Sequence, residues 1–162
     1  MRCSTFLTGA HIVNENEAMT YAISLANIAS LSSGDVPVGA VIIDANGNII
    51  STGHNQRELI RDSTAHAELI AIKSANKSIN SWRLENLTLV VTLEPCLMCA
   101  GAILQSRVSR VVFGAWDKKA GACGSVWDVL RDGRSLHKVE VIGGVLEKEC
   151  AALLSNFFSQ KR

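Results

Sequence analysis

Two cysteines in the sequence stand at a spacing that suits a metal ion. Cys96 and Cys99 are separated by two residues and follow Pro95, where a helix is expected to begin. In the first turn of a helix this spacing places both sulfurs on one side, and the free N–H groups and positive dipole end favour thiolates. Two thiolates supply half of a tetrahedral zinc shell, although a redox dithiol or two packed thiols would have the same spacing.

His66 and Glu68 extend this pattern into one that could activate water. They lie two positions apart, so they would not share a face in mid-helix, but at a first turn both can point into a cleft. A catalytic zinc site needs three protein ligands, an open fourth position for water, and a carboxylate that moves protons without binding the metal. His66, Cys96 and Cys99 would supply the ligands, and Glu68 would supply the carboxylate.

The segments around these residues alternate between helical and strand patterns. Apolar side chains at three- and four-residue spacing predict helices over residues 15–32, 65–78, 96–106 and 146–158. Apolar, β-branched runs predict strands over residues 38–43, 48–52, 87–93, 108–113 and 139–142. Asn46-Gly47 indicates a hairpin between the first two strands, and Asn14 with Glu17 indicates a cap ahead of the first helix. Residues 126–130 are expected to form one helical turn.

This order of elements predicts one α/β domain over residues 1–162. Strands that alternate with helices are typical of a three-layer α/β/α fold, and the hairpin would be the antiparallel part of a mixed five-stranded sheet. The continuous apolar run at 87–93 is the pattern of a strand buried on both faces. A content of 48% hydrophobic and 19% charged residues excludes a disordered chain.

No segment indicates export or membrane insertion. No apolar run reaches the roughly 18 residues that a spanning helix needs. The N-terminus has only Phe6-Leu7 as an apolar pair, which is too little for a secretory signal. Five cysteines without such a signal indicate reduced thiols rather than a disulfide framework. We therefore expect a cytoplasmic protein with no membrane partner.

The charge of the chain is small overall but uneven along it. A net charge of +1 excludes a globally basic nucleic-acid protein. Residues 107–138, however, contain seven basic and three acidic side chains, a net charge of +4. Such a segment could contact phosphates, and a solvated loop is the alternative interpretation.

The order His-x-Glu followed by Pro-Cys-x-x-Cys is the signature of zinc nucleobase deaminases. From about residue 15 to residue 158, the chain resembles the cytidine and nucleotide deaminase superfamily and, within it, the bacterial tRNA-specific adenosine deaminases. The similar segments are residues 35–41, Asn55, 64–68, 93–102 and 114–125. Residues 1–13 lie outside the resemblance and form an extension of unknown role.

The resemblance implies a cytidine-deaminase-like fold and the hydrolytic deamination of adenosine to inosine at wobble position 34 of a tRNA anticodon. One Zn²⁺ per subunit would be held by His66, Cys96 and Cys99, and Glu68 would be the catalytic proton carrier. The partners implied are a tRNA anticodon stem-loop and a second copy of the chain, since the resemblance indicates a site completed across a homodimer.

The resemblance also implies which residues meet the substrate. Asn55 would hydrogen-bond the target nucleoside, in a pocket formed with Val36, Pro37 and Ala67. The loop residues Asp117, Lys118 and Lys119 would contact the flanking nucleotides. Glu94, which precedes Pro95, is expected to be structural. Two features depart from the family pattern: Trp116 stands where a basic residue is expected, and the C-terminus, Gln160-Lys161-Arg162, is short.

Two other functions remain open at the level of the sequence. One is a deaminase of a free base or nucleoside such as guanine, cytosine or cytidine, for which the zinc chemistry would be the same. The basic segment and the 117–119 loop favour RNA over these substrates. The other is a zinc-stabilised binding module without turnover. A structural zinc normally has four protein ligands, and no fourth ligand stands out in this sequence.

Overall fold

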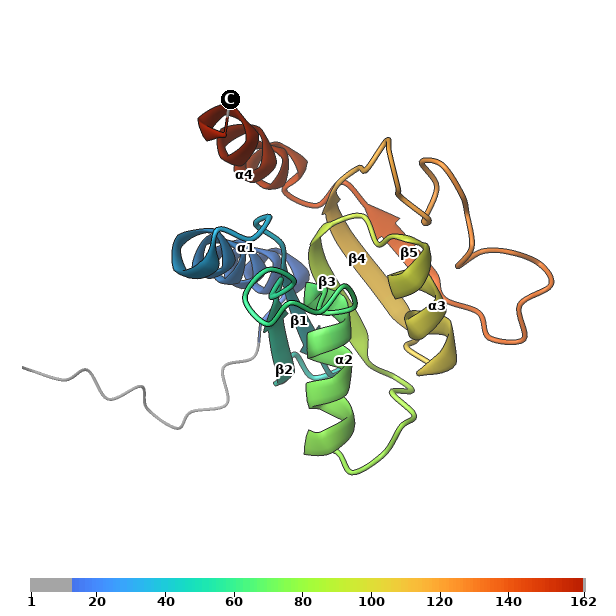
Figure 1. Ribbon diagram of the computed structural model, residues 1–162. Coiled ribbons are helices and arrows are strands. Elements are labelled where there is room, and N and C mark those ends of the chain that lie inside the picture. The colour runs from blue at the N-terminus through green and yellow to red at the C-terminus, as the bar shows by residue number, and fades with distance from the viewer. Residues whose placement is uncertain (1–12, 162) are drawn as a thin grey trace, which may run out of the picture.

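The computed structural model describes residues 13–161, which form four helices and five strands in the order α1-β1-β2-α2-β3-α3-β4-β5-α4 (Figure 1). The helices are α1 (Glu15–Ser33), α2 (Ala67–Ser78), α3 (Leu97–Gln105) and α4 (Glu147–Gln160). The strands are β1 (Gly39–Ile43), β2 (Ile49–His54), β3 (Thr88–Leu93), β4 (Arg110–Ala115) and β5 (Glu140–Gly143). No helix within residues 13–161 combines the length and the apolar character needed to cross a membrane.

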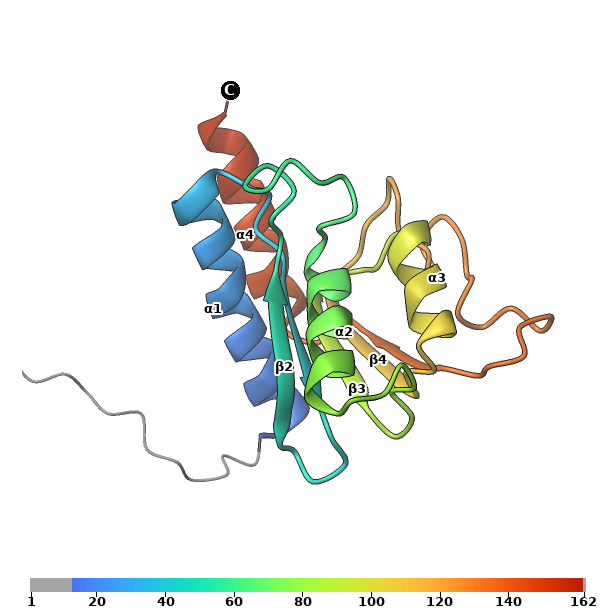
Figure 2. The same cartoon turned by 60° about the horizontal axis from the view of Figure 1, so that its bottom comes forward.

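The strands form one mixed sheet in the order β2-β1-β3-β4-β5. β1 is antiparallel to β2 and to β3, whereas β3, β4 and β5 are parallel. Helices α1 and α4 cover one face of the sheet, and α2 and α3 cover the other (Figures 1 and 2). The predicted three-layer α/β/α fold with a mixed five-stranded sheet is confirmed.

The central strands are buried on both faces, and their side chains alternate between two cores. In β3, Leu89 and Val91 face the core under α2 and α3, whereas Val90 faces the core under α1 and α4. Val111 and Val112 divide in the same way in β4. This alternation follows from the two-residue period of a strand and explains the continuous apolar runs in the sequence.

Local signals place the first helix and the hairpin as predicted. The Asn14 side chain accepts a hydrogen bond from the Glu17 N–H at 3.0 Å, and the Glu17 carboxylate accepts one from the Asn14 N–H at 2.9 Å. This reciprocal pair is a capping box. Gly47 adopts a positive φ of 82° in the β1–β2 turn, where the Val13 N–H also donates to its carbonyl. Residues 1–12 of the N-terminal extension lie outside the described residues.

The prediction of a helical turn at residues 126–130 is wrong. Cys123 instead forms an isolated antiparallel bridge with Asp128, and the Val129 N–H donates to the Ala122 carbonyl. The Gly124 N–H donates to the Trp127 carbonyl. These backbone donors find acceptors across the loop, so they are not available for the hydrogen bonds of a helical turn.

One edge of the sheet collects the segments that matter for chemistry. The carboxyl ends of β2, β3 and β4 lie along this edge, together with the amino ends of β1, α2 and α3 (Figure 2). Gly53 in β2 lets α2 approach closely, because a Cβ at this position would collide with the Ala67 carbonyl and the Ala71 nitrogen. Ligand sites of α/β sheets are found at such an edge.

Candidate active site

Three of the predicted site residues converge at the starts of two helices. His66 is the N-cap residue of α2, Cys96 is the N-cap residue of α3, and Cys99 lies in the first turn of α3. The Cys96 and Cys99 sulfurs lie 3.7 Å and 3.6 Å from Nδ1 of His66. All three ligand atoms lie within 4.8 Å of one another. The sequence separation of 30 residues between His66 and Cys96 is therefore closed by the packing of α2 and α3.

This arrangement fits a zinc ion. Zinc binds sulfur at about 2.3 Å and imidazole nitrogen at about 2.0–2.1 Å, so tetrahedral ligands place sulfur and nitrogen about 3.6 Å apart. The two observed sulfur–nitrogen separations match this value. Two thiolates and an imidazole with an open fourth position are the donor set of a catalytic rather than a structural zinc site.

Glu68 lies in the first turn of α2 and is 4% exposed. Burial raises the pKa of Glu68 to about 7, and the nearby His66 partly opposes this shift. A carboxyl group with a pKa near neutrality is ionised and protonated in comparable amounts, so it can both accept and donate a proton at little cost. Glu68 is thus suited to carry protons beside the three ligands.

The thiols of Cys96 and Cys99 differ in pKa before a metal binds. Hydrogen bonds from the Cys99 thiol and from His66 lower the pKa of Cys96 to about 4, although partial burial opposes the shift. The pKa of Cys99 is raised, because its proton is shared with the Cys96 sulfur and because it is buried. The pKa of His66 is raised by its hydrogen bond to Cys96. Before metal binding, Cys96 is therefore the thiolate of the pair, and Cys99 must release a proton when zinc binds.

In protein stripped of zinc, we expect iodoacetamide to alkylate Cys96 at a nearly constant rate between pH 6 and pH 8. The pKa of about 4 keeps this thiol ionised throughout that range, whereas an ordinary thiol with a pKa of about 8.5 would react roughly tenfold faster for each added pH unit. Cys99, Cys123 and Cys150 are buried and carry raised pKa values, so they should react far more slowly. Peptide mass spectrometry measures each rate, and added zinc should protect Cys96.

The ligands and Glu68 open onto a cavity of about 620 Å³. Seven residues predicted for the site line it: Val36, Asn55, His66, Ala67, Glu68, Cys96 and Asp117. The structure does not bring every predicted residue to its wall. Pro37 is buried and does not line the cavity, and Cys99 is buried beside the other ligands. Lys118 and Lys119 are exposed beyond the rim, next to Asp117.

Asn55 connects two walls of the cavity. It is 7% exposed, and its Nδ2 donates to the Val36 carbonyl at 3.1 Å while its Oδ1 accepts from the Arg57 N–H at 3.3 Å. A carboxamide has two N–H donors and two acceptor lone pairs, so one donor and one lone pair are left for a ligand. Asn55 can therefore hold the Val36 wall and hydrogen-bond a base at the same time.

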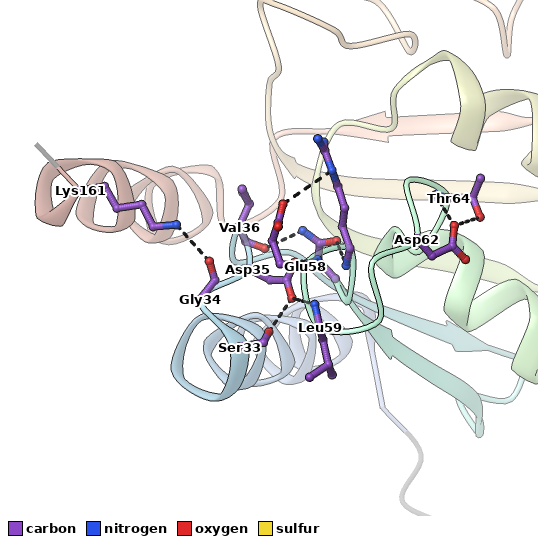
Figure 3. A network of polar contacts seen from close by, with 11 residues as sticks. Ser33, Gly34, Asp35, Val36, Glu58, Leu59, Asp62, Thr64 and Lys161 are labelled. Atoms are coloured by element: carbon purple, nitrogen blue, oxygen red, sulfur yellow. Dashed lines mark hydrogen bonds and ion pairs between the residues drawn. The ribbon is translucent and has the colours of Figure 1, made fainter.

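Asp35 is a site residue to which the sequence analysis gave no role. Its carboxylate is fully buried and accepts hydrogen bonds from the N–H groups of Glu58 at 2.7 Å and Leu59 at 3.2 Å, and from the Ser33 hydroxyl at 2.5 Å. Figure 3 shows this network between the end of α1 and the turn that follows β2. The Asp35 carboxylate thus holds the Glu58 turn in place as one wall of the cavity.

Two cations at the cavity were also not anticipated. Arg57 lines it from the turn after β2, and Lys161 lines it from the end of α4. The Lys161 ammonium donates to the Gly34 carbonyl at 3.1 Å (Figure 3) and lies over the Phe157 ring. Neither residue belongs to a motif, and α4 reaches the cavity through its packing against β4 and α1, so sequence spacing carried no signal for them.

The basic segment 107–138 does not form one surface. Arg110 pairs with Glu15 and Glu140 at the start of β4, the end of the strand away from the cavity. Arg131 pairs with Asp128, and Arg134 pairs with Asp132. Within residues 13–161, Lys118 and Lys119 have no ion-pair partner. The positive charge available beside the cavity in this segment is therefore concentrated on these two lysines.

Comparison with known proteins places this site in a family. The model of the cytidine and deoxycytidylate deaminase zinc-binding region matches residues 3–115. A tRNA-specific adenosine deaminase of Bacillus subtilis (strain 168) is 52% identical over 129 residues, which cover 80% of this chain and 80% of that protein. One of Haemophilus influenzae (strain Rd) is 49% identical over 148 residues, which cover 91% of this chain and 85% of that protein.

Solved structures of deaminases have the same fold as this chain. A chain from a study of A-to-I editing by tRNA:A34 deaminases at the wobble position of transfer RNA has a TM-score of 0.81 and 36% identity, covering 85% of this chain and 99% of that chain. The guanine deaminase of Nitrosomonas europaea has a TM-score of 0.81 at 23% identity, covering 98% and 94%, and shares the fold alone. The chain belongs to the cytidine and deoxycytidylate deaminase zinc-binding family, in the group of the tRNA-specific adenosine deaminases.

Proposed function

We propose that this protein is a zinc-dependent hydrolase that deaminates adenosine to inosine at wobble position 34 of a tRNA anticodon. The observation that carries the proposal is the cluster of His66, Cys96 and Cys99 beside buried Glu68, in a chain about half identical to two tRNA-specific adenosine deaminases. The function, the enzyme class and the zinc cofactor expected from the sequence are borne out by these relatives.

The residues of the cavity have two kinds of role in the reaction, metal binding and proton transfer. Zinc, when held by His66, Cys96 and Cys99, would supply a Lewis acid that lowers the pKa of a bound water far enough for it to ionise near neutral pH. Glu68 would accept a proton from the water that attacks C6 of adenine and deliver it to the adjacent ring nitrogen. It would then transfer the proton of the new C6 hydroxyl to the amino group, so that the C6–N bond breaks and ammonia leaves. The raised pKa of about 7 allows Glu68 to exchange protons in both directions near neutral pH.

The remaining cavity residues bind and orient the base. The free N–H and lone pair of Asn55 can meet the target nucleoside, with Val36 and Ala67 as apolar walls. The base must leave its stack to enter a cavity at the sheet edge, and an unpaired anticodon base does so at low cost. An anticodon loop therefore suits this cavity better than a duplex.

A side-by-side assay tests the proposal. The purified protein is given an anticodon stem-loop with adenosine at the wobble position and, separately, free adenosine, cytidine and guanine. Inosine should form in the stem-loop alone. Turnover of a free base or nucleoside with an inert stem-loop would preserve the zinc chemistry but refute the RNA substrate.

Replacing Lys118 and Lys119 together by Gln should weaken stem-loop binding and flatten its salt dependence. Each phosphate contact on single-stranded nucleic acid contributes about 0.7 to the slope of log K against log salt concentration, so the slope should fall by up to about 1.4. Lys73 and Lys77 on exposed positions of α2 are the matched control, because their double replacement makes the same charge change. An unchanged slope in the 118/119 variant would contradict contact by this loop.

We also propose a homodimer, supported by large apolar side chains that remain exposed near the start of α3. Leu97 and Met98 are 44% and 36% exposed, and Trp116, Val126 and Trp127 in the following loop are 41–46% exposed. The bridge between Cys96 and Gly121 holds this loop against the start of α3. Light scattering should give about twice the chain mass of 17.4 kDa, and a monomer at micromolar concentration would refute the dimer.

A cytoplasmic location stays a prediction.

A further inference from the structure

The carboxylate of Glu94 is buried between the zinc-ligand turn and the loop that carries the RNA-facing residues. Glu94 directly follows β3, is 2% exposed, and lies two residues before Cys96. Its Oε1 accepts hydrogen bonds from the N–H groups of Cys123 at 2.9 Å and Ser125 at 3.0 Å. Its Oε2 accepts from the Asp117 N–H at 2.9 Å and from the Ser125 hydroxyl. One carboxylate thus receives four donors from a single loop.

Only a carboxylate satisfies these donors. Within residues 13–161, Glu94 has no ion-pair partner, so both of its buried oxygens are satisfied by N–H and O–H donors alone. An ionised carboxylate accepts on both oxygens, whereas a carboxamide accepts on one and donates on the other. Charge-assisted bonds of this kind are stronger than neutral ones, and a buried charge left without them is costly.

The bonds to Glu94 fix the part of the loop that faces the cavity. The Asp117 side chain accepts from the N–H groups of Lys119 at 2.9 Å and Ala120 at 3.2 Å, which forms the turn that presents Lys118. Asp117 and Ala120 both line the cavity. The backbone of Asp117, held by Glu94, is therefore the anchor from which both lysines project.

The loop is also in direct contact with the turn that carries the first cysteine ligand. Gly121 forms a bridge with Cys96, and the Ala122 N–H donates to the Pro95 carbonyl at 2.8 Å. A Cβ at Gly121 would collide with the Glu94 carboxylate and the Asp117 carbonyl. The loop and the ligand turn therefore share one packed interface, with the Glu94 carboxylate at its centre.

We propose that Glu94 is a positioning residue for RNA binding: it clamps the 117–125 loop to the zinc-ligand turn, and so sets where Asp117, Lys118 and Lys119 meet the nucleotides flanking the target base. This inference rests on the proposed function for its substrate. This role goes beyond stabilising the fold, because Glu94 fixes the position of the RNA-contacting loop relative to the reacting centre.

Glu94→Gln tests the clamp with little change in side-chain volume. In this variant the amide nitrogen would face N–H donors from which it cannot accept a hydrogen bond. Losing hydrogen bonds to a charged group changes an equilibrium constant by about 10- to 100-fold. We expect KM for the stem-loop to rise by that factor, kcat to stay within about threefold, and zinc to remain at one ion per chain. A fall in kcat with unchanged KM would overturn the proposal.

Two further variants separate positioning from stability. Asp44→Asn is the matched control, because Asp44 accepts from the Asn46 N–H, the Asn48 N–H and the Asn48 side chain in the β1–β2 turn, away from the cavity. It should leave KM and kcat unchanged. Ser125→Ala removes one donor and keeps the carboxylate, so KM should rise about 3- to 10-fold. This variant decides the matter if Glu94→Gln does not fold.

Limited trypsin digestion measures how readily the 117–125 loop opens, without any RNA substrate. Cleavage after Lys118 and Lys119 should be at least about tenfold faster in Glu94→Gln than in the wild-type protein and unchanged in Asp44→Asn, because cleavage requires the loop to open. Cleavage at the wild-type rate would overturn the clamp. An inert stem-loop with the wild-type protein would refute the proposed function instead, and faster cleavage in Glu94→Gln would then still support the clamp.

Discussion

Glu68→Gln is expected to lower kcat for the stem-loop by about 100- to 10,000-fold, the range in which a positioned acid–base group contributes to catalysis. The change keeps the shape of the side chain but removes its ability to accept and release a proton. His66, Cys96 and Cys99 are untouched, so zinc should remain at one ion per chain. Single-turnover kinetics and zinc analysis on the same preparation measure both effects.

The pH dependence of stability provides a control for this variant in zinc-free protein. Burial raises the pKa of Glu68 from 4.5 to about 7, so between these values the folded state binds more protons than the unfolded state. The Glu68 carboxyl therefore costs stability increasingly as the pH rises from about 4.5 to about 7. Glu68→Gln should gain stability relative to wild type over that window. Full activity in the variant would show that another group carries the proton.

Cys99→Ala should lose zinc and activity together. Removing one of three protein ligands costs more than the roughly 10- to 100-fold in affinity that is typical of losing a group that only supports a ligand. Cys99 is buried against the other ligands, with no other histidine, cysteine, aspartate or glutamate of residues 13–161 forming part of the cluster. Competition with a chromophoric chelator measures the affinity, and the deamination assay measures the loss of turnover.

Cys150→Ala is the matched control for the ligand variant. Cys150 is 1% exposed and packs in the core under α1 and α4, on the opposite face of the sheet. The same chemical change there should lower the unfolding temperature modestly and leave zinc content and kcat unchanged. Wild-type zinc affinity in Cys99→Ala would mean that the ligand set is wrong.

Much of the fold could be predicted because its signals are local. The capping box of Asn14 and Glu17 and the hairpin turn at Gly47 depend on residues a few positions apart. The alternation of Leu89, Val90 and Val91 between two cores follows from the strand itself. The prediction of a helical turn at 126–130 was wrong because the backbone N–H groups there donate to acceptors across the loop rather than to those of a helical turn.

The sequence alone predicted the candidate zinc ligands His66, Cys96 and Cys99 and the candidate proton carrier Glu68, because zinc chemistry restricts the residue types and a helix start restricts their spacing. Only the tertiary structure decided what surrounds them. Asp35 meets its backbone partners 23 and 24 residues away, and Glu94 meets its partners 23 to 31 residues away. A buried carboxylate leaves no periodic pattern in the sequence, since the donors that stabilise it are backbone N–H groups, which every residue except proline carries.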